Sequence, residues 1–323
     1  MTATQTSIRK MKPTAVSVRP LDVTVLAGGP SAEREVSLDS GRSVHAALTR
    51  LGHVAAIHDV GPDNLAALDR PVDFVFIALH GEFGEDGTVQ AELNARGVPY
   101  SGSGAEASRL AMDKAESKRC FLRAGVPTPD FEVVDALNRD EVMQRFALPA
   151  VVKPVASGSS VDTYIIRARD ELHTRIDTVI ASHGAALVER FVAGPELTVG
   201  ILGDEALPVC EIRTRREFYD YDAKYVDDST EYLFDLDLPR SLVERVQTLS
   251  VEAHKALGCS VCSRVDWMVD ATTLEPFALE VNTIPGFTGH SLLPKAASQI
   301  GLNFDGLCQR IIDLSLGAFE LRE

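Results

Sequence analysis

Two apolar segments late in the chain carry charged and amide side chains at alternating positions, and this pattern constrains the fold more than any other. Residues 262–270 read CSRVDWMVD, residues 275–282 read EPFALEVN, and the intervening ATTL is typical of a turn, so we expect an antiparallel hairpin. Alternate side chains of a strand share a face. Arg264 and Asp266 therefore share one face of the first strand, and Glu280 and Asn282 one face of the second. Pairing should bring the four together.

This polar cluster on an apolar hairpin needs a physical reason, because a buried carboxylate is costly unless it is paired or binds a metal. Asp266, Glu280 and Asn282 offer the hard oxygen ligands that magnesium prefers, and substrate phosphate often completes the shell of that ion. A structural salt-bridge cluster with Arg264 is the alternative. The following segment, NTIPGFTGHSL, favours the metal site, since its glycines let the backbone approach a ligand closely.

Length and composition narrow the class of protein. The chain has 323 residues, of which 45% are hydrophobic and 24% charged, as in soluble globular proteins of two or three domains. A formal net charge of −15 argues against nucleic acid as a partner. No apolar run is long enough for a transmembrane helix, so no membrane association is expected, and residues 1–20 lack the apolar core of a secretory signal. We expect a cytoplasmic protein whose five cysteines are buried, reduced thiols.

The chain divides into a flexible N-terminal extension, residues 1–20, and three folded units. Residues 21–112 alternate strand, helix and strand, which predicts a parallel sheet covered on both faces. Residues 113–203 predict an α+β unit, which opens with one helix across AEASRLAMDKAESKRCFLRAG that ends at Gly125. Residues 204–323 contain a polar loop, RREFYDYDAKYVDDSTEY, then a long helix, the hairpin and closing helices.

Several segments carry residues suited to a nucleotide. Lys153 stands at a strand end before the small-residue loop of Ser159 and Ser160, and such loops free backbone N–H groups to bind phosphate. The spacing matches neither the P-loop nor the GxGxxG pattern. Other candidates elsewhere in the chain are Lys114, Glu189 and Glu196. Taken singly, each is more simply interpreted as part of a flexible loop or a solvated surface.

Eight motifs follow one another along the chain: LAGGPSAEREVSL, ALHGEFGEDG, SGSGAEASRLAMDK, VKPVASGSSV, ERFVAGPELTV, FYDYDAKY, SRVDWM and LEVNTIPGFTGHSL. In this order they resemble the D-alanine–D-alanine ligase family of the ATP-grasp superfamily, over residues 22–313. The resemblance implies an ATP-grasp fold, partly α/β and partly α+β, with three domains and a parallel-sheet N-terminal domain.

The resemblance also implies an ATP site between the central and C-terminal domains. The residues expected at the phosphates are Lys114, Lys153, Ser160 and Lys224. Glu189 would contact the adenine and Glu196 the ribose. Two magnesium ions, replaceable by manganese, would be held by Asp266, Glu280 and Asn282.

Substrate residues are implied in the same way. Glu33 would hold the ammonium group of the first D-alanine, with Ser159 and Tyr225 as hydrogen-bonding partners that close the loops, and His80 beside the pocket. Arg264 and the backbone N–H of Gly286 would form the oxyanion site. Ser291 and Leu292, at the start of a predicted helix, would bind the carboxylate of the second D-alanine, a placement that a helix N-terminus favours independently.

The implied activity is ATP-dependent formation of D-alanyl-D-alanine, through a D-alanyl phosphate, for peptidoglycan precursors, by a homodimer. Two alternatives remain: a ligase of the same fold that uses D-lactate or D-serine as second substrate, and a non-catalytic ATP-binding protein. Asp162 and Ser263 replace glycines usual in the family, and Phe287 replaces a frequent methionine. We expect Asp162 to point away from the triphosphate, whose charge it would repel.

Overall fold

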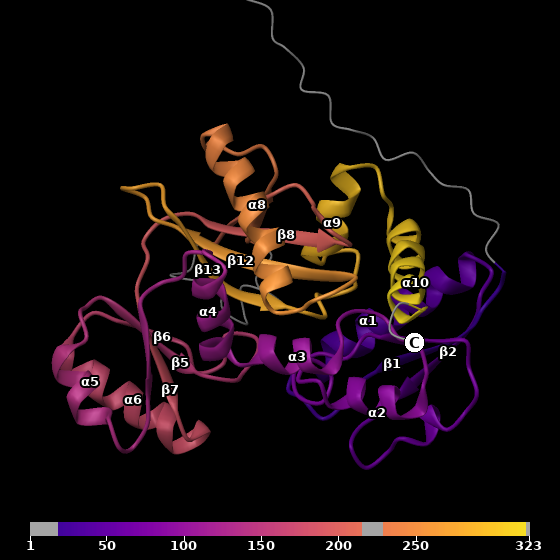
Figure 1. Cartoon of the computed structure of the whole chain (residues 1–323), viewed down its shortest axis with the longest axis horizontal. Coiled ribbons are helices and arrows are strands. Elements are labelled where there is room, and N and C mark those ends of the chain that lie inside the picture. Colours follow the sequence, from indigo (N-terminus) through magenta and orange to yellow (C-terminus); the bar gives the residue numbers. More distant parts are fainter. Residues whose placement is uncertain (1–18, 215–228, 321–323) are drawn as a thin grey trace, which may run out of the picture.

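Three β-sheets organise the computed structural model, which describes residues 19–214 and 229–320 (Figure 1). Lys224, Tyr225 and nearly all of the expected N-terminal extension lie outside the described residues. Within the described ranges, no helix combines the length and apolar character needed to cross a membrane. All five cysteines are buried and free, as predicted.

The first sheet is parallel, and helices cover both of its faces as the sequence predicted. Its unit comprises β1 (Asp22–Ala27), α1 (Arg34–Arg50), β2 (Val54–Asp59), η1 (Ala66–Leu68), β3 (Phe74–Ile77), α2 (Thr88–Arg96) and, from the far end of the chain, α10 (Phe304–Glu320). The strand order is β2–β1–β3. Val25 lies in a core shared with α1 and α10, whereas Leu26 lies in a second core with α2. The last helix therefore completes the first unit (Figure 1).

The central sheet is antiparallel, with order β4–β7–β5–β6. Its elements are β4 (Phe131–Val134), α5 (Arg139–Arg145), β5 (Ala150–Pro154), β6 (Tyr164–Ile166), α6 (Arg169–His183) and β7 (Ala186–Arg190). Val152 and Val188 share a core with the two helices. Because side chains alternate along a strand, Lys153 and Glu189 lie on the opposite face, away from these two helices.

The third sheet contains the predicted hairpin. Its elements are β8 (Glu196–Leu202), β9 (Glu205–Ala206), β10 (Cys210–Arg213), β11 (Glu231–Leu233), α8 (Arg240–Ala256), β12 (Cys262–Val269), β13 (Pro276–Asn282) and α9 (Leu292–Gln299). The order is β11–β10–β8–β12–β13, with β9 beside β8. Val265 and Trp267 face the core beneath α8, so Asp266 faces the other way. The strand β8, which we placed in the unit of residues 113–203, pairs with β12, and the domain division remains an expectation.

The helix expected across residues 105–125 is two helices, which corrects that prediction. α3 (Ala105–Met112) ends at Asp113, and α4 (Lys114–Arg123) begins directly after it. Asp113 has an extended ψ of 99° and its carboxylate accepts a hydrogen bond from the N–H of Glu116 at 2.9 Å, which caps α4. The N–H of Lys114 bonds to the carbonyl of Val155 at 2.9 Å. Because the helix is interrupted at Asp113, the backbone of Lys114 can form this hydrogen bond with the loop that follows β5.

Candidate active site

Two adjoining cavities, of about 740 and 640 Å³, lie between the three sheets. They share Lys114, Glu280 and the loop residues Ser157, Gly158 and Ser159. The first is also lined by Glu33, His80, Arg264, Asn282, Gly286, Ser291 and Leu292. The second is also lined by Lys153, Ser160, Glu189, Glu196 and Asp266. Every predicted site residue within the described ranges therefore lines at least one cavity.

The hairpin register brings its four polar side chains together. Arg264 lies opposite Asn282, and Asp266 opposite Glu280, with a bulge after Asp266. The guanidinium of Arg264 donates two hydrogen bonds to Asp266, at 2.9 and 2.7 Å, and the hydroxyl of Thr198 donates a third at 2.7 Å. The Asp266 carboxylate is thus oriented by partners on two strands.

Glu280 lies where the two cavities meet, and its Oε2 is 3.4 Å from the Nζ of Lys114. Asn282 ends the same strand, and its Oδ1 accepts a hydrogen bond from the N–H of Ile284 at 2.9 Å. That bond holds the start of the loop containing Gly286. The positively charged Lys114 and the negatively charged Glu280 therefore form the boundary between the cavities.

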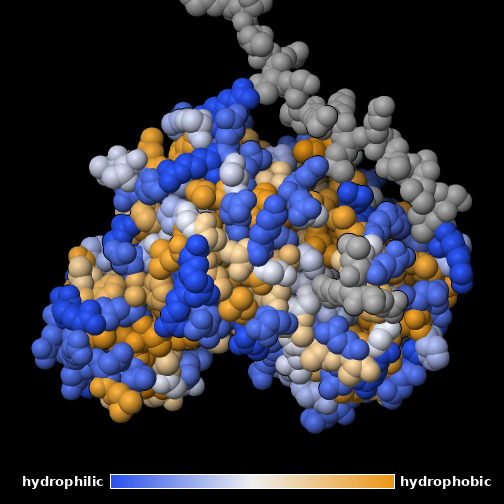
Figure 2. All heavy atoms as spheres, viewed as in Figure 1, coloured by the Kyte–Doolittle hydropathy of each residue, from blue (hydrophilic) through white to orange (hydrophobic). Residues whose placement is uncertain are grey.

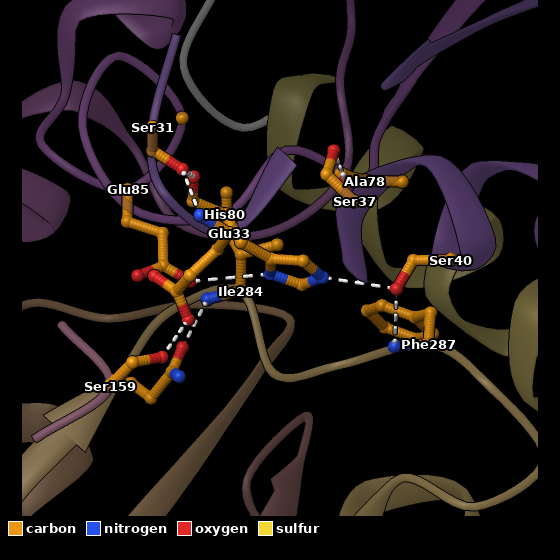
Figure 3. A network of polar contacts seen from close by, with 12 residues as sticks. Ser31, Glu33, Ser37, Ser40, Ala78, His80, Glu85, Ser159, Ile284 and Phe287 are labelled. Carbon is orange, nitrogen blue, oxygen red and sulfur yellow. Dashed lines mark hydrogen bonds and ion pairs between the residues drawn. The ribbon is translucent and has the colours of Figure 1, made fainter. Parts of the chain in front are cut away.

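The small-residue loop between β5 and β6 reaches the N-terminal unit. The hydroxyl of Ser159 donates to the carboxylate of Glu33, so these two predicted substrate residues are in direct contact (Figure 3). Ser159 and Ser160 have positive φ angles of 50° and 57°. A Cβ at Gly158 would lie 2.9 Å from an oxygen of Glu33, so glycine at this position allows the loop and the Glu33 carboxylate to approach closely.

A buried charge triad lies at the inner end of the second cavity. Glu189 contacts Lys153 through Oε1 at 2.6 Å and Lys118 through Oε2 at 2.8 Å. Burial raises the pKa of Glu189, but the two ammonium groups outweigh this effect and lower it to about 2. Burial lowers the pKa of Lys118 to about 8, because Glu189 offsets only part of the desolvation.

Sequence reasoning missed Lys118, which is fully buried and also donates to the hydroxyl of Thr128 at 2.8 Å. A signal was present: Lys118 follows Lys114 by four residues, a spacing that places both on one helical face. Lysines at this spacing are ordinary on solvated helices, so only the packing of α4 against the sheets distinguishes this one.

The loop after β13 and the start of α9 form the far wall of the first cavity. Ser291 is the N-cap residue of α9, and its Oγ accepts a hydrogen bond from the N–H of Thr288 at 3.0 Å. A Cβ added at Gly286 would lie 2.7 Å from that oxygen. Because Gly286 has no side chain, the hydroxyl of Ser291 can lie close to the loop.

Two departures from the family pattern have local explanations. The carboxylate of Asp162 bonds to His183 at 2.8 Å and to the hydroxyl of Tyr164 at 2.9 Å, and it lines neither cavity. These two hydrogen bonds lower the pKa of Asp162. Asp162 has a φ of 51°, a conformation that glycine adopts freely and aspartate tolerates. The carboxylate is thus held by His183 and Tyr164 and lines neither cavity, in line with the expectation that it points outward.

Ser263, the residue before Arg264, contacts a buried histidine. Its hydroxyl lies 2.7 Å from Nδ1 of His254 on α8, and both side chains are buried. Burial lowers the pKa of His254 to about 4, because the charged imidazolium would lose its hydration.

We expect stability to decrease as the pH falls from 6.5, the ordinary pKa of histidine, towards 4. In that window the unfolded chain binds a proton at His254 that the folded protein does not, so unfolding is favoured, by up to about 3 kcal/mol. Above this window the ring is neutral in both states, and the effect vanishes. Urea unfolding at pH 7.5 and 4.5 measures the difference.

His254→Gln should remove this part of the pH dependence, whereas His173→Gln, at an exposed position of α6, should not. An unchanged difference between the two pH values in His254→Gln would contradict the assignment.

Comparison with known proteins agrees with this geometry. A family model described as the D-ala D-ala ligase C-terminus matches residues 121–313, and one described as the N-terminus matches residues 55–103. A D-alanine–D-alanine ligase of Syntrophotalea carbinolica is 43% identical over 293 residues, covering 90% of this chain and 94% of the relative. One of Bordetella petrii is 45% identical over 296 residues, covering 90% of each.

Solved structures show the same fold. The D-alanine–D-alanine ligase of Bacillus anthracis complexed with ATP has a TM-score of 0.82 at 35% identity, covering 94% of this chain and all of that one. The VanG D-Ala:D-Ser ligase of Enterococcus faecalis has a TM-score of 0.81 at 28% identity, covering 92% of this chain and all of that one. The expected ATP-grasp fold is therefore confirmed. With the family models, these relatives show that the chain belongs to the D-alanine–D-alanine ligase family.

Proposed function

We propose that this protein uses ATP to join two D-alanine molecules into D-alanyl-D-alanine, releasing ADP and phosphate, for the synthesis of peptidoglycan precursors. The contact between the two cavities at Lys114 and Glu280 supports the proposal most directly. A nucleotide in one cavity could present its terminal phosphate to a substrate in the other. The family of the chain supports the same activity.

ATP would occupy the second cavity. Lys114 and Lys153 would contact its phosphates with the loop N–H groups around Ser160, and Glu189 and Glu196 would bind adenine and ribose. The relative from Bacillus anthracis was solved with ATP, which supports a nucleotide site in this fold. Lys224 would contribute from outside the described residues.

The two amino acids would occupy the first cavity. Glu33 would bind the first ammonium group, with Ser159 and Tyr225 as partners and His80 close by. Arg264 and the N–H of Gly286 would stabilise the oxyanion as charge develops on the acyl group. Ser291 and Leu292 would bind the second carboxylate at the N-terminus of α9.

Asp266, Glu280 and Asn282 would hold magnesium or manganese. Two facing carboxylates and an amide are a suitable set of hard oxygen donors, and Arg264 and Thr198 already orient Asp266 as outer-shell partners do. No group of three or more His, Cys, Asp or Glu side chains suited to a metal occurs in the described ranges, so Asn282 and phosphate oxygens would complete the set. When bound, the metal supplies positive charge that offsets the repulsion between carboxylate and triphosphate.

Two displacements would make the product. An oxygen of the first carboxylate attacks the γ-phosphorus and the bond to ADP breaks, giving D-alanyl phosphate. The amine nitrogen of the second D-alanine then attacks the acyl carbon, the bond to phosphate breaks, and the nitrogen loses a proton. The loop of Ser159, held against Glu33, would keep water from hydrolysing the acyl phosphate.

A ligase for D-serine is the second candidate, because the VanG D-Ala:D-Ser ligase shares the fold at 28% identity. D-lactate as second substrate is a further alternative, whereas the family of the chain argues against a non-catalytic ATP-binding protein. The homodimer implied by the family and the cytoplasmic location expected from the sequence also stay proposals.

Product analysis tests the function. The protein with ATP, magnesium and equal amounts of D-alanine, D-serine and D-lactate should yield chiefly the mass of D-alanyl-D-alanine, and ADP release should stop when a chelator removes the metal or L-alanine replaces D-alanine. A dominant mixed product would favour a rival ligase. ATP binding without ADP release would favour the binding protein.

A further inference from the structure

Ser40, a fully buried residue of α1, lies between His80 and the loop after β13, and no motif of the sequence analysis singled it out (Figure 3). Its Oγ is 3.0 Å from Nε2 of His80 and 3.3 Å from the backbone nitrogen of Phe287. One hydroxyl therefore joins the N-terminal unit to the residue directly after Gly286.

The direction of each hydrogen bond follows from the groups present. The N–H of Phe287 can only donate, so the Ser40 oxygen accepts from it. The single hydroxyl proton is then available for Nε2 of His80, which acts as acceptor. This arrangement leaves the ring hydrogen on Nδ1, which faces a carboxylate oxygen of Glu85 at 3.5 Å. The Ser40 hydroxyl on one side of the ring and the Glu85 carboxylate on the other together favour this orientation and tautomer of His80.

The same hydroxyl holds one end of the loop. The Asn282 side chain holds the beginning through the N–H of Ile284 at 2.9 Å, and Ser40 holds Phe287, so Gly286 lies between two anchored amides. The Phe287 ring is buried edge-on against Phe76, with centroids 5.4 Å apart. Removal of the hydroxyl would leave a buried N–H without its partner, which favours a shift of the loop.

We infer that Ser40 is a positioning residue that couples the orientation of His80 to the placement of the Gly286 amide, an inference that rests on the proposed ligase function. Ser40 lines neither cavity and would act through its two partners. A displaced amide misaligns a donor at the oxyanion, and such donors act on turnover more than on binding.

Ser37 provides a matched control. It lies one turn earlier on α1, is equally buried, and donates its hydroxyl to the carbonyl of Ala78 at 2.8 Å rather than to His80 or the loop (Figure 3). Ser37→Ala therefore removes a buried hydroxyl and its hydrogen bond from the same helix but removes neither hydrogen bond of Ser40.

Steady-state kinetics and hydrogen exchange test the inference. Ser40→Ala should lower kcat for D-alanine at least about tenfold while KM for ATP stays within about twofold, and the Phe287 amide should exchange at least about tenfold faster. Ser37→Ala should do neither. Ser40→Cys, whose thiol is a weaker hydrogen-bonding group, should give intermediate values, and it provides the same comparison if Ser40→Ala does not fold.

Equal kcat in Ser40→Ala and Ser37→Ala, or unchanged exchange at Phe287, would overturn the coupling even when the wild-type protein is an active ligase. A folded wild-type protein that forms no dipeptide would instead contradict the proposed function. The exchange comparison would then still decide whether Ser40 anchors the loop.

Discussion

Glu280→Gln is expected to lower turnover by roughly 100-fold or more, the scale of losing a charged group that organises transition-state electrostatics. The substitution keeps the size of the side chain but removes the negative charge at the boundary of the two cavities. That charge faces Lys114 at 3.4 Å and Asp266 across the hairpin. Coupled measurement of ADP release with saturating ATP and D-alanine gives the turnover.

Glu275→Gln is the matched control, because Glu275 lies just before β13 and forms a surface ion pair with Arg245 at 2.5 Å. It should leave turnover within about twofold, since surface ion pairs contribute little. Glu280→Gln with wild-type turnover would remove Glu280 from the proposed metal site.

Lys118→Met is expected to destabilise the protein by about 3–5 kcal/mol and to raise KM for ATP. The substitution leaves Glu189 buried with one cation instead of two, and breaking a buried charge network by removing one partner is much more costly than replacing the whole network. Lys153 would then be drawn more strongly to Glu189 and less available to a phosphate. Urea unfolding and initial rates at varied ATP concentration measure the two effects.

Arg119→Met is the control for Lys118→Met. Arg119 is the next residue of α4, half-exposed, and pairs with Glu116 on the surface. Its loss should change the free energy of unfolding by less than about 1 kcal/mol. A similar decrease in the free energy of unfolding in the two variants would show that the buried triad is no more important to stability than a surface pair.

Hydrophilic residues dominate much of the visible face, and apolar residues are interspersed among them (Figure 2). With a net charge of −15, the molecule as a whole repels anions, so an anionic nucleotide must be held by local cations such as Lys114 and Lys153.

The sequence alone determined the hairpin and what it carries. Apolar and polar residues alternate through β12 and β13, and a shift by one residue would bury Asp266 in the core occupied by Trp267, so the faces of the strands were predictable. The parallel first sheet was predictable for a similar reason, because its strands and helices alternate along the chain.

Only the tertiary structure decided which distant segments share a surface. Nothing local to β8 indicates that it pairs with β12, and nothing local to Ser40 indicates that it meets Phe287, 247 residues later. The sequence around Lys118 likewise looks like that of a solvated helix. Lys118 is buried because α4 packs between sheets. The periodicity of a segment shows which of its faces is apolar. Which other element covers that face depends on long-range packing, and this packing cannot be predicted from a short segment.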